Sequence, residues 1–247
     1  MNKSAAERFF DKIFEILRKI VETQRDKIQE AANVITEAVA NGGMVYVFGT
    51  GHSHLIAEEA FARAGGLACF GAILDPSFML HTGALKSGML ERLPGYAAIL
   101  LNYYFISGKD VLIIVSNSGI NAVSVEMAIE GKKRGAKIIA ITSLEHSKSM
   151  KSRHPSGKKL YELADIVIDN CGILGDAVLD IEGVKCKVAP TSTITGATIL
   201  NALVAQVAEN LAKKGIEPPV WVSGNVKGSE LHNLQLALKY KDKLRHL

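Results

Sequence analysis

Apolar runs that alternate with helical patterns constrain the fold of this chain more than any other feature. Five short runs have the composition of buried strands, at 44–48, 67–74, 110–115, 137–142 and 166–169. Helical patterns at 53–64 and 121–134 lie between them, and the second ends at Arg134-Gly135, a basic last turn followed by a closing glycine. Strands that are apolar along their whole length and are joined by helices are typical of a parallel sheet buried on both faces. The sequence therefore predicts an α/β fold with a doubly wound sheet.

The turn Ser116-Asn117-Ser118-Gly119 has the features of an anion-binding site. It directly follows the strand at 110–115 and precedes a helix that begins near Asn121. The first backbone N–H groups of a helix have no partner within the helix, and the helix dipole favours negative charge beside them. The two serine hydroxyls add hydrogen-bond donors. The turn can therefore hold a phosphate without a lysine.

Two further turns have the same design. The first strand leads into Gly49-Thr50-Gly51-His52-Ser53-His54. Later, Pro190-Thr191-Ser192-Thr193 opens a helix at 194–214, after a further predicted strand at 186–189. Each turn joins the end of a strand to the start of a helix and so offers unpaired N–H groups. Several such turns in one domain indicate a phosphorylated ligand.

Several common motifs are absent. The dinucleotide fingerprint GxGxxG fails because His54 occupies its last position, counted from Gly49, and no GxxxxGK[ST] phosphate loop occurs. The GxSxG turn of hydrolases is also missing, since Ser116 stands where its first glycine belongs. His52, His54 and His81 could meet around zinc, but their spacing favours polar lining of a cleft. We therefore expect neither a cofactor nor a bound metal.

The segments outside the alternation are helical. Residues 1–43 form an N-terminal extension with apolar residues at three- and four-residue steps, which predicts one long helix or two helices end to end. Its wide apolar stripe fits packing against a partner chain or against its own domain. Residues 44–215 form the main domain, and residues 216–247 form a C-terminal segment with a final helix at 229–244.

The sequence indicates neither a nucleic acid partner nor a membrane partner. The formal charge of +4 is small and dispersed, and no helix-turn-helix precedes the main domain. The densest basic stretch, 148–159, is predicted to be a solvated loop, with contact to an anionic substrate as the alternative. No segment reaches the roughly 18 uninterrupted apolar residues of a membrane span, and the N-terminus lacks a signal-peptide core.

The three cysteines indicate a reducing compartment. Cys69, Cys171 and Cys186 lie in or beside apolar runs and form no CxxC pair, which predicts buried free thiols. A chain of 247 residues can bury a substantial core without disulfides. We therefore expect a cytoplasmic protein.

Taken together, the three turns resemble the ligand loops of SIS domains, the sugar isomerase phosphosugar-binding fold. The resemblance covers roughly residues 44–214. More narrowly, the chain resembles a bacterial group of SIS proteins regarded as phosphoheptose or phosphosugar isomerases, through Ser116-Asn117-Ser118-Gly119, Asp169-Asn170-Cys171-Gly172 and Ser223-Gly224-Asn225-Val226. The resemblance implies a five-stranded parallel sheet of flavodoxin-like order, with ligands bound where the first and third strands end side by side.

The resemblance also implies how a ligand is held. Ser116, Ser118 and the amide groups around Gly119 would hold the phosphate. Ser192 and Thr193 would close the site around the phosphate, and the first turn would face the sugar. The expected binding residues are Gly51, His52, Ser53, Ser116, Asn117, Ser118, Gly119, Asn121, Ser192 and Thr193. Helix capping by the serines is the alternative, because it uses the same amide groups.

Three side chains are candidates for proton transfer. In related heptose isomerases and muramic-acid etherases, a functional glutamate lies at a place that corresponds to a position near Arg63, and Glu58 and Glu59 are the glutamates nearest to it. Glu91 lies in the long insertion after the second strand, where the etherases also bring an acidic residue toward the sugar. His232 follows Ser223-Gly224-Asn225 in a stretch that the family often presents to a neighbouring subunit, and histidine titrates near neutral pH. The catalytic candidates are therefore Glu59, Glu91 and His232.

The function implied by the resemblance is a sugar-phosphate isomerase of the aldose–ketose, phosphoheptose isomerase type. A lyase of the muramic-acid 6-phosphate etherase type and a non-catalytic sugar-phosphate sensor are the alternatives. Both the isomerase reaction and the lyase reaction require a carboxylate or histidine in the cleft. The expected partners are a sugar phosphate and further copies of the chain in a homodimer or homotetramer.

Overall fold

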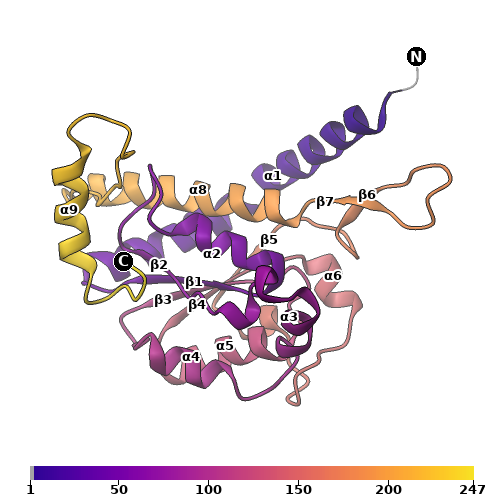
Figure 1. The fold of residues 1–247 in the computed structure, drawn as a ribbon, viewed down its shortest axis with the longest axis horizontal. Helices are drawn as coiled ribbons and strands as arrows, with labels where there is room; N and C mark the ends of the chain where they lie inside the picture. Colours follow the sequence, from indigo (N-terminus) through magenta and orange to yellow (C-terminus); the bar gives the residue numbers. More distant parts are fainter. Residues whose placement is uncertain (1–2) are drawn as a thin grey trace.

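A five-stranded parallel sheet forms the centre of the computed structural model, which describes residues 3–247 (Figure 1). The strands are β1 (Val45–Gly49), β2 (Phe70–Ala72), β3 (Val111–Val115), β4 (Lys137–Thr142) and β5 (Ile166–Asp169). They lie in the order β2-β1-β3-β4-β5, and all neighbouring pairs are parallel. The doubly wound sheet of flavodoxin-like order is therefore confirmed, and β1 and β3 end side by side.

Helices cover both faces of the sheet, which explains the continuous apolar character of its strands. Every residue of β1 and β3 is buried. Figure 1 shows α2 (His54–Ala60) and α8 (Ser192–Lys213) on one side, and α4 (Ala97–Tyr103) and α5 (Ala122–Lys133) on the other. Two short helices after β4, α6 (Leu144–Ser149) and α7 (Leu160–Leu163), complete the layers beside β5. A strand with both faces covered gains from apolar residues at every position.

The N-terminal segment is one helix, α1 (Ala5–Ala40), of 36 residues. Ser4 and Glu7 form a capping box at its start. Its second half packs against α8 and the sheet, where Ala31, Ala32 and Ile35 are fully buried. Its first half extends away from the body in Figure 1, and there Phe10, Phe14 and Val21 are 57%, 53% and 58% exposed.

The insertion between β2 and β3 folds over the end of the sheet. After Asp75 the chain forms two short 3₁₀ turns, η2 (Pro76–Phe78) and η3 (Leu80–Thr82), and then α3 (Ala84–Leu90) and α4. The buried ring of Phe78 makes an edge contact with Phe48 at the end of β1, with ring centroids 6.1 Å apart. This contact anchors the insertion beside the first turn.

Two expectations near residue 186 are wrong. The predicted strand at 186–189 is displaced to β7 (Val188–Pro190), which pairs antiparallel with β6 (Ala177–Leu179) in a separate hairpin. This hairpin packs on the first half of α1, where the guanidinium of Arg8 donates to the Asp180 carbonyl oxygen at 3.1 Å. Cys186 lies in the hairpin loop and is exposed, whereas Cys69 and Cys171 are buried as expected.

The C-terminal segment closes the open edge of the sheet beside β2. The final helix, α9 (Ser229–Tyr240), ends four residues before its predicted end at 244, and turns continue the chain. Leu244 is buried against Gly71 of β2 and Tyr46 of β1. Within residues 3–247, no helix combines the length and the apolar character required to cross a membrane.

Candidate functional site

The three turns predicted to bind a ligand meet at the carboxyl end of the sheet. A narrow cleft there is lined by residues of all three turns and of the β5 end: Ser53, Ile56, Val115, Asn117, Asn170, Ser192 and Thr193. It lies beside β1 and β3, at the point where ligands bind in open parallel sheets. Asn170 belongs to the stretch that supported the resemblance, but sequence reasoning did not assign it to the site.

The turn after β3 presents unpaired backbone donors. The N–H groups of Asn117, Ser118, Ile120 and Asn121 donate no hydrogen bond to any residue in 3–247, and neither does the Ser118 hydroxyl. The Ser116 hydroxyl is used within the turn, because it accepts from the Gly119 N–H at 3.1 Å. Ser116 therefore shapes the turn, while Ser118 and the free amides remain available to an anion.

Neighbouring segments hold this turn in place. Gly119 has a φ of +62°, and a Cβ there would lie 3.0 Å from Thr142 Oγ1 and 3.1 Å from Ser147 Oγ. The Gly119 carbonyl oxygen accepts from the Leu160 N–H at 2.9 Å. The backbone conformation at position 119 therefore favours glycine, and the close approach of the two hydroxyls leaves little room for a larger residue.

The basic stretch 148–159 does more than form a solvated loop. The Arg153 N–H donates to the Ile120 carbonyl oxygen at 2.9 Å, and the Arg153 guanidinium donates to Asn121 Oδ1 at 2.7 Å. A cation therefore lies beside the free amides of the turn. Sequence reasoning missed Arg153 as an individual residue, because only the density of positive charge pointed to this stretch.

Two amide side chains connect the ends of β3 and β5. Asn117 Oδ1 accepts from Asn170 Nδ2 at 2.9 Å, and Asn170 Oδ1 accepts from the Gly172 N–H at the same distance. The side chains of Asn117 and Asn121 thus make contacts within the protein. Both residues can contribute backbone N–H groups to a ligand, while their side chains position the loops.

The insertion brings Glu91 to the first turn. Glu91 follows α3 directly, and its Oε2 accepts a hydrogen bond from Thr50 Oγ1 at 2.7 Å. Its carbonyl oxygen accepts from the Val123 N–H in the first turn of α5. Glu91 is therefore fixed between the end of β1 and the start of α5. Of the sugar-facing candidates, Ser53 lines the cleft, whereas His52 is exposed.

His54 is buried beside the same turn, and its ring is incompletely paired. Nδ1 lies 3.2 Å from Glu58 Oε1, while Nε2 has no hydrogen-bond partner within residues 3–247. Burial lowers the pKa of His54 because it disfavours the charged ring, and the carboxylate of Glu58 opposes that shift. Among the described residues, no three His, Cys, Asp or Glu side chains are grouped so that they could hold a metal ion.

The stability of the fold is expected to decrease in mild acid. The pKa of His54 and the pKa of His146 are both lowered by burial, so the unfolded chain binds their protons more readily than the folded chain. Their contribution is complete above about pH 6.5 and is lost as the pH falls below that value. Urea unfolding at about pH 7.5 and about pH 5.5 measures this difference. Replacing both residues with asparagine reduces the difference, and an unchanged pH dependence in that double variant contradicts the assignment.

The third turn is already occupied by a side chain of the protein. The backbone N–H groups of Thr191 and Ser192 both donate to the Asp176 carboxylate, at 3.0 and 2.8 Å. Ser192 and Thr193 still line the cleft. Sequence reasoning did not single out Asp176, since it lies 15 residues before Thr191.

The other two catalytic candidates lie away from the three turns. Glu59 is paired with Arg63 and accepts from Asn201 Nδ2 of α8 at 2.7 Å. His232 lies on α9, where its Nε2 donates to the Val220 carbonyl oxygen at 2.8 Å. Figure 1 shows α9 at the opposite end of α8 from the β6–β7 hairpin. Within one chain, Glu91 is therefore the candidate that the fold brings to the turns.

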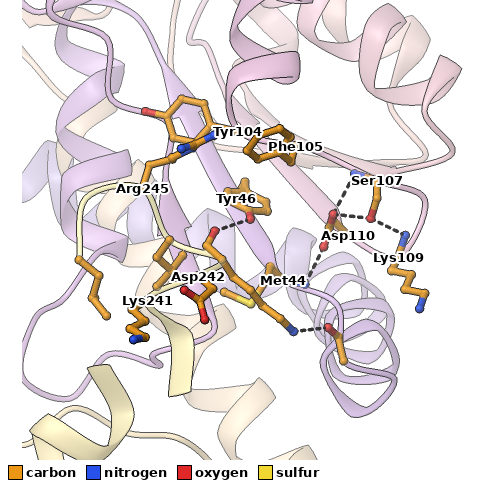
Figure 2. Close-up of a pocket in the computed structure, with 14 residues that line it drawn as sticks. Met44, Tyr46, Tyr104, Phe105, Ser107, Lys109, Asp110, Lys241, Asp242 and Arg245 are labelled. Carbon is orange, nitrogen blue, oxygen red and sulfur yellow. Dashed lines mark hydrogen bonds between the residues drawn. The ribbon is translucent and has the colours of Figure 1, made fainter. Parts of the chain in front are cut away.

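A larger cavity, of about 620 Å³, lies at the opposite end of the sheet (Figure 2). Its walls include Tyr46, Asp110 and the C-terminal segment. The polar groups there are used by the fold: the Tyr46 hydroxyl donates to the Lys243 carbonyl oxygen, and the Asp110 carboxylate accepts from the Met44 and Ser107 N–H groups. Because the free donors lie at the carboxyl ends of the strands, the candidate site is the narrow cleft.

Comparisons with known proteins identify the family of this chain. A family model described as "SIS domain" matches residues 8–143. A UPF0309 protein of Caldanaerobacter subterraneus subsp. tengcongensis is 47% identical over 242 residues, which cover 97% of this chain and 98% of the relative.

Two solved structures share the fold at low sequence identity. The phosphoheptose isomerase GmhA from Neisseria gonorrhoeae has a TM-score of 0.57 at 15% identity, and the match covers 83% of this chain and 97% of that one. The Vibrio vulnificus NanR protein, complexed with ManNAc-6P, has a TM-score of 0.53 at 13% identity, over 96% of this chain and 70% of that one. The strand order, the three turns and the matched family model lead to one conclusion: this chain belongs to the SIS domain family.

Proposed function

We propose that this protein binds a sugar phosphate in the cleft and isomerises it between aldose and ketose forms. The observation that supports the proposal most directly is the set of four unpaired N–H groups in the turn after β3, those of Asn117, Ser118, Ile120 and Asn121. Arg153 lies beside this turn, and Glu91 lies at the neighbouring turn. The similar GmhA structure is that of a phosphoheptose isomerase, and NanR binds ManNAc-6P. Both similarities are consistent with a phosphosugar ligand in the cleft of this protein.

The phosphate binds at the turn after β3 in this proposal. Its oxygens accept hydrogen bonds from the free backbone N–H groups and the Ser118 hydroxyl, in the positive end of the α5 dipole. The Arg153 guanidinium adds a positive charge at the rim. The sugar then extends toward Ser53, Ser192 and Thr193, which line the same cleft.

Glu91 acts as the base in this proposal. Aldose–ketose isomerisation removes a proton from the carbon next to the carbonyl group and returns it to the former carbonyl carbon, while a proton moves between the two oxygens. No other reactant is consumed. The Glu91 carboxylate takes and returns the carbon-bound proton, and the Thr50 hydroxyl holds it in place. His232 and Asn233 instead hold the segment 220–222 against α9.

A homo-oligomer remains part of the proposal. The first half of α1 exposes Phe10, Phe14 and Val21, and α9 exposes Leu231, Leu234 and Leu238. In both helices the exposed apolar residues are separated by three, four or seven positions, so they form stripes along one side. Burial of these stripes against a second copy would remove apolar surface from water.

Ser118→Ala is expected to weaken sugar-phosphate binding about 10-fold, because it removes one hydrogen bond to a charged group. Thermal shift across a panel of hexose, heptose and amino-sugar phosphates identifies the ligand, and calorimetry then compares the variant with the wild type. Ser149→Ala is the control, since it removes an exposed serine hydroxyl that donates to the His146 carbonyl oxygen.

The same panel can overturn the proposal. Equal stabilisation by sugars with and without a phosphate contradicts the assignment of the turn, since ligand linkage should favour the anion. Product analysis of each binding sugar phosphate then distinguishes the reactions. Cleavage of a carbon–oxygen bond of the sugar, with release of the attached group, identifies a lyase. Binding of a sugar phosphate without formation of any product identifies a sensor.

A further inference from the structure

Asp176 places a negative charge of the protein itself at the start of α8. Its Oδ1 accepts from the Thr191 and Ser192 N–H groups, at 3.0 and 2.8 Å, and from Thr191 Oγ1 at 3.3 Å. Its Oδ2 accepts from the Ser192 hydroxyl at 2.6 Å. These are the donors with which a hydroxyl-rich helix start holds an external anion. A carboxylate of the protein itself therefore occupies this anion position.

The backbone around Asp176 is bent to reach this position. Asp176 has a φ of +70° and follows Gly175, whose φ is +81°. The left-handed conformation is unfavourable for most residues but is tolerated by aspartate and asparagine. Asp176 also lies at the base of the β6–β7 hairpin, directly before β6. Four hydrogen bonds from one dipeptide offset the cost of this conformation.

The side chains beside the two helix starts that line the cleft thus have opposite charges. At the turn after β3 the N–H groups are free and Arg153 lies beside them. At the start of α8 the two N–H groups are taken by a carboxylate. Asn117 from the first and Ser192 and Thr193 from the second line the same narrow cleft. A bound molecule that spans the cleft lies between a turn with free N–H groups, beside Arg153, and a helix start whose first N–H groups are bonded to Asp176.

We propose that Asp176 is a specificity-determining residue that restricts the cleft to sugar phosphates with one anionic group. The proposal rests on the proposed function. The phosphate binds at the turn after β3, and the other end of the sugar faces α8. A second phosphate or a carboxylate at that end is repelled by Asp176, which already occupies the Thr191 and Ser192 N–H groups and the Ser192 hydroxyl. A hydroxyl, acetamido or ammonium group at that end meets no such repulsion.

Calorimetry with fructose 6-phosphate and fructose 1,6-bisphosphate tests this inference. The wild type must first be shown to bind the monophosphate. If another sugar monophosphate binds best, that monophosphate and the corresponding bisphosphate are compared instead. The wild type is expected to favour the monophosphate by about 10-fold or more. Asp176→Asn keeps an oxygen acceptor for the α8 N–H groups but removes the charge, and Asp176→Ala removes both. In both variants the two ligands are expected to bind within about threefold of each other.

Asp180→Asn is the matched control, because Asp180 is an exposed carboxylate of the same hairpin, 3.6 Å from Lys187 Nζ. It removes the same charge without contact to α8 and is expected to keep the wild-type preference. Circular dichroism and thermal unfolding establish that each variant is folded.

The outcomes separate this inference from the proposed function. Folded Asp176 variants that keep the wild-type preference overturn the inference and leave the proposed function intact. Folded variants that lose both ligands equally also overturn it, because Asp176 then only positions Ser192. A wild type that binds no sugar phosphate at all overturns the proposed function instead.

Discussion

Glu91→Gln is expected to lower turnover of the sugar phosphate by about 10²- to 10⁴-fold and to leave its dissociation constant nearly unchanged. Glutamine has almost the same size as glutamate, and its amide oxygen can still accept from Thr50 Oγ1. The variant therefore keeps the position of the insertion but cannot take a proton from carbon. Steady-state kinetics measure the turnover, and calorimetry with the same sugar phosphate measures the affinity.

The same substitution at Glu59 provides the comparison for this prediction. Glu59 lies in a pair with Arg63 and a hydrogen bond with Asn201, away from the three turns. We expect Glu59→Gln to leave turnover within about twofold of the wild type, since exposed ion pairs contribute little. Wild-type turnover in Glu91→Gln would show that Glu91 is not the base. A loss confined to Glu59→Gln would reassign the role.

Gly49→Ala is expected to destabilise the fold by about 3 kcal/mol and to abolish ligand binding. An added Cβ at position 49 would lie 2.3 Å from the Ser53 carbonyl oxygen and 2.5 Å from its carbonyl carbon, so the backbone of the first turn must move. For a chain of this length, the melting temperature should fall by roughly 6 to 12 °C. Thermal unfolding with and without the sugar phosphate measures both effects.

Gly51→Ala is the matched control for that variant. Gly51 lies in the same turn with a φ of +56°, and a Cβ there would meet no atom within 4 Å. Its cost is therefore limited to backbone conformation, about 1 to 2 kcal/mol. If the two variants unfold at the same temperature, close packing at Gly49 does not determine the geometry of the turn.

The sheet could be predicted because its signals are local. Each strand is a short apolar run, and each turn at a carboxyl end contains residues whose hydrogen-bonding chemistry is visible in the sequence, as at Ser116-Asn117-Ser118-Gly119. The order of the strands followed from the family resemblance rather than from periodicity. The hairpin near residue 186 was misplaced because a three-residue strand has too few residues to show a pattern.

The electrostatics of the site could not be predicted in the same way. Glu91 meets Thr50 across 41 positions, and Arg153 meets Asn121 across 32. Such distances in sequence are bridged only when the insertion and the basic stretch fold back on the sheet. Asp176 lies closer to its partners, yet its left-handed backbone has no signature in composition. Sequence patterns therefore located the turns and the family resemblance pointed to Glu91, whereas the positions of Arg153 and Asp176 beside the turns follow only from the folded chain.

The hydrogen bonds around the turn after β3 have a consequence for the thermodynamics of binding. The carbonyl oxygens of Asn117, Gly119 and Ile120 accept from the N–H groups of Ser143, Leu160 and Arg153, respectively. Three segments from elsewhere in the chain thus fix the peptide planes whose N–H groups face outward. The conformational entropy of this turn is lost during folding, so an arriving phosphate does not have to order it. The preorganised N–H dipoles therefore lower the free-energy cost of binding the anion.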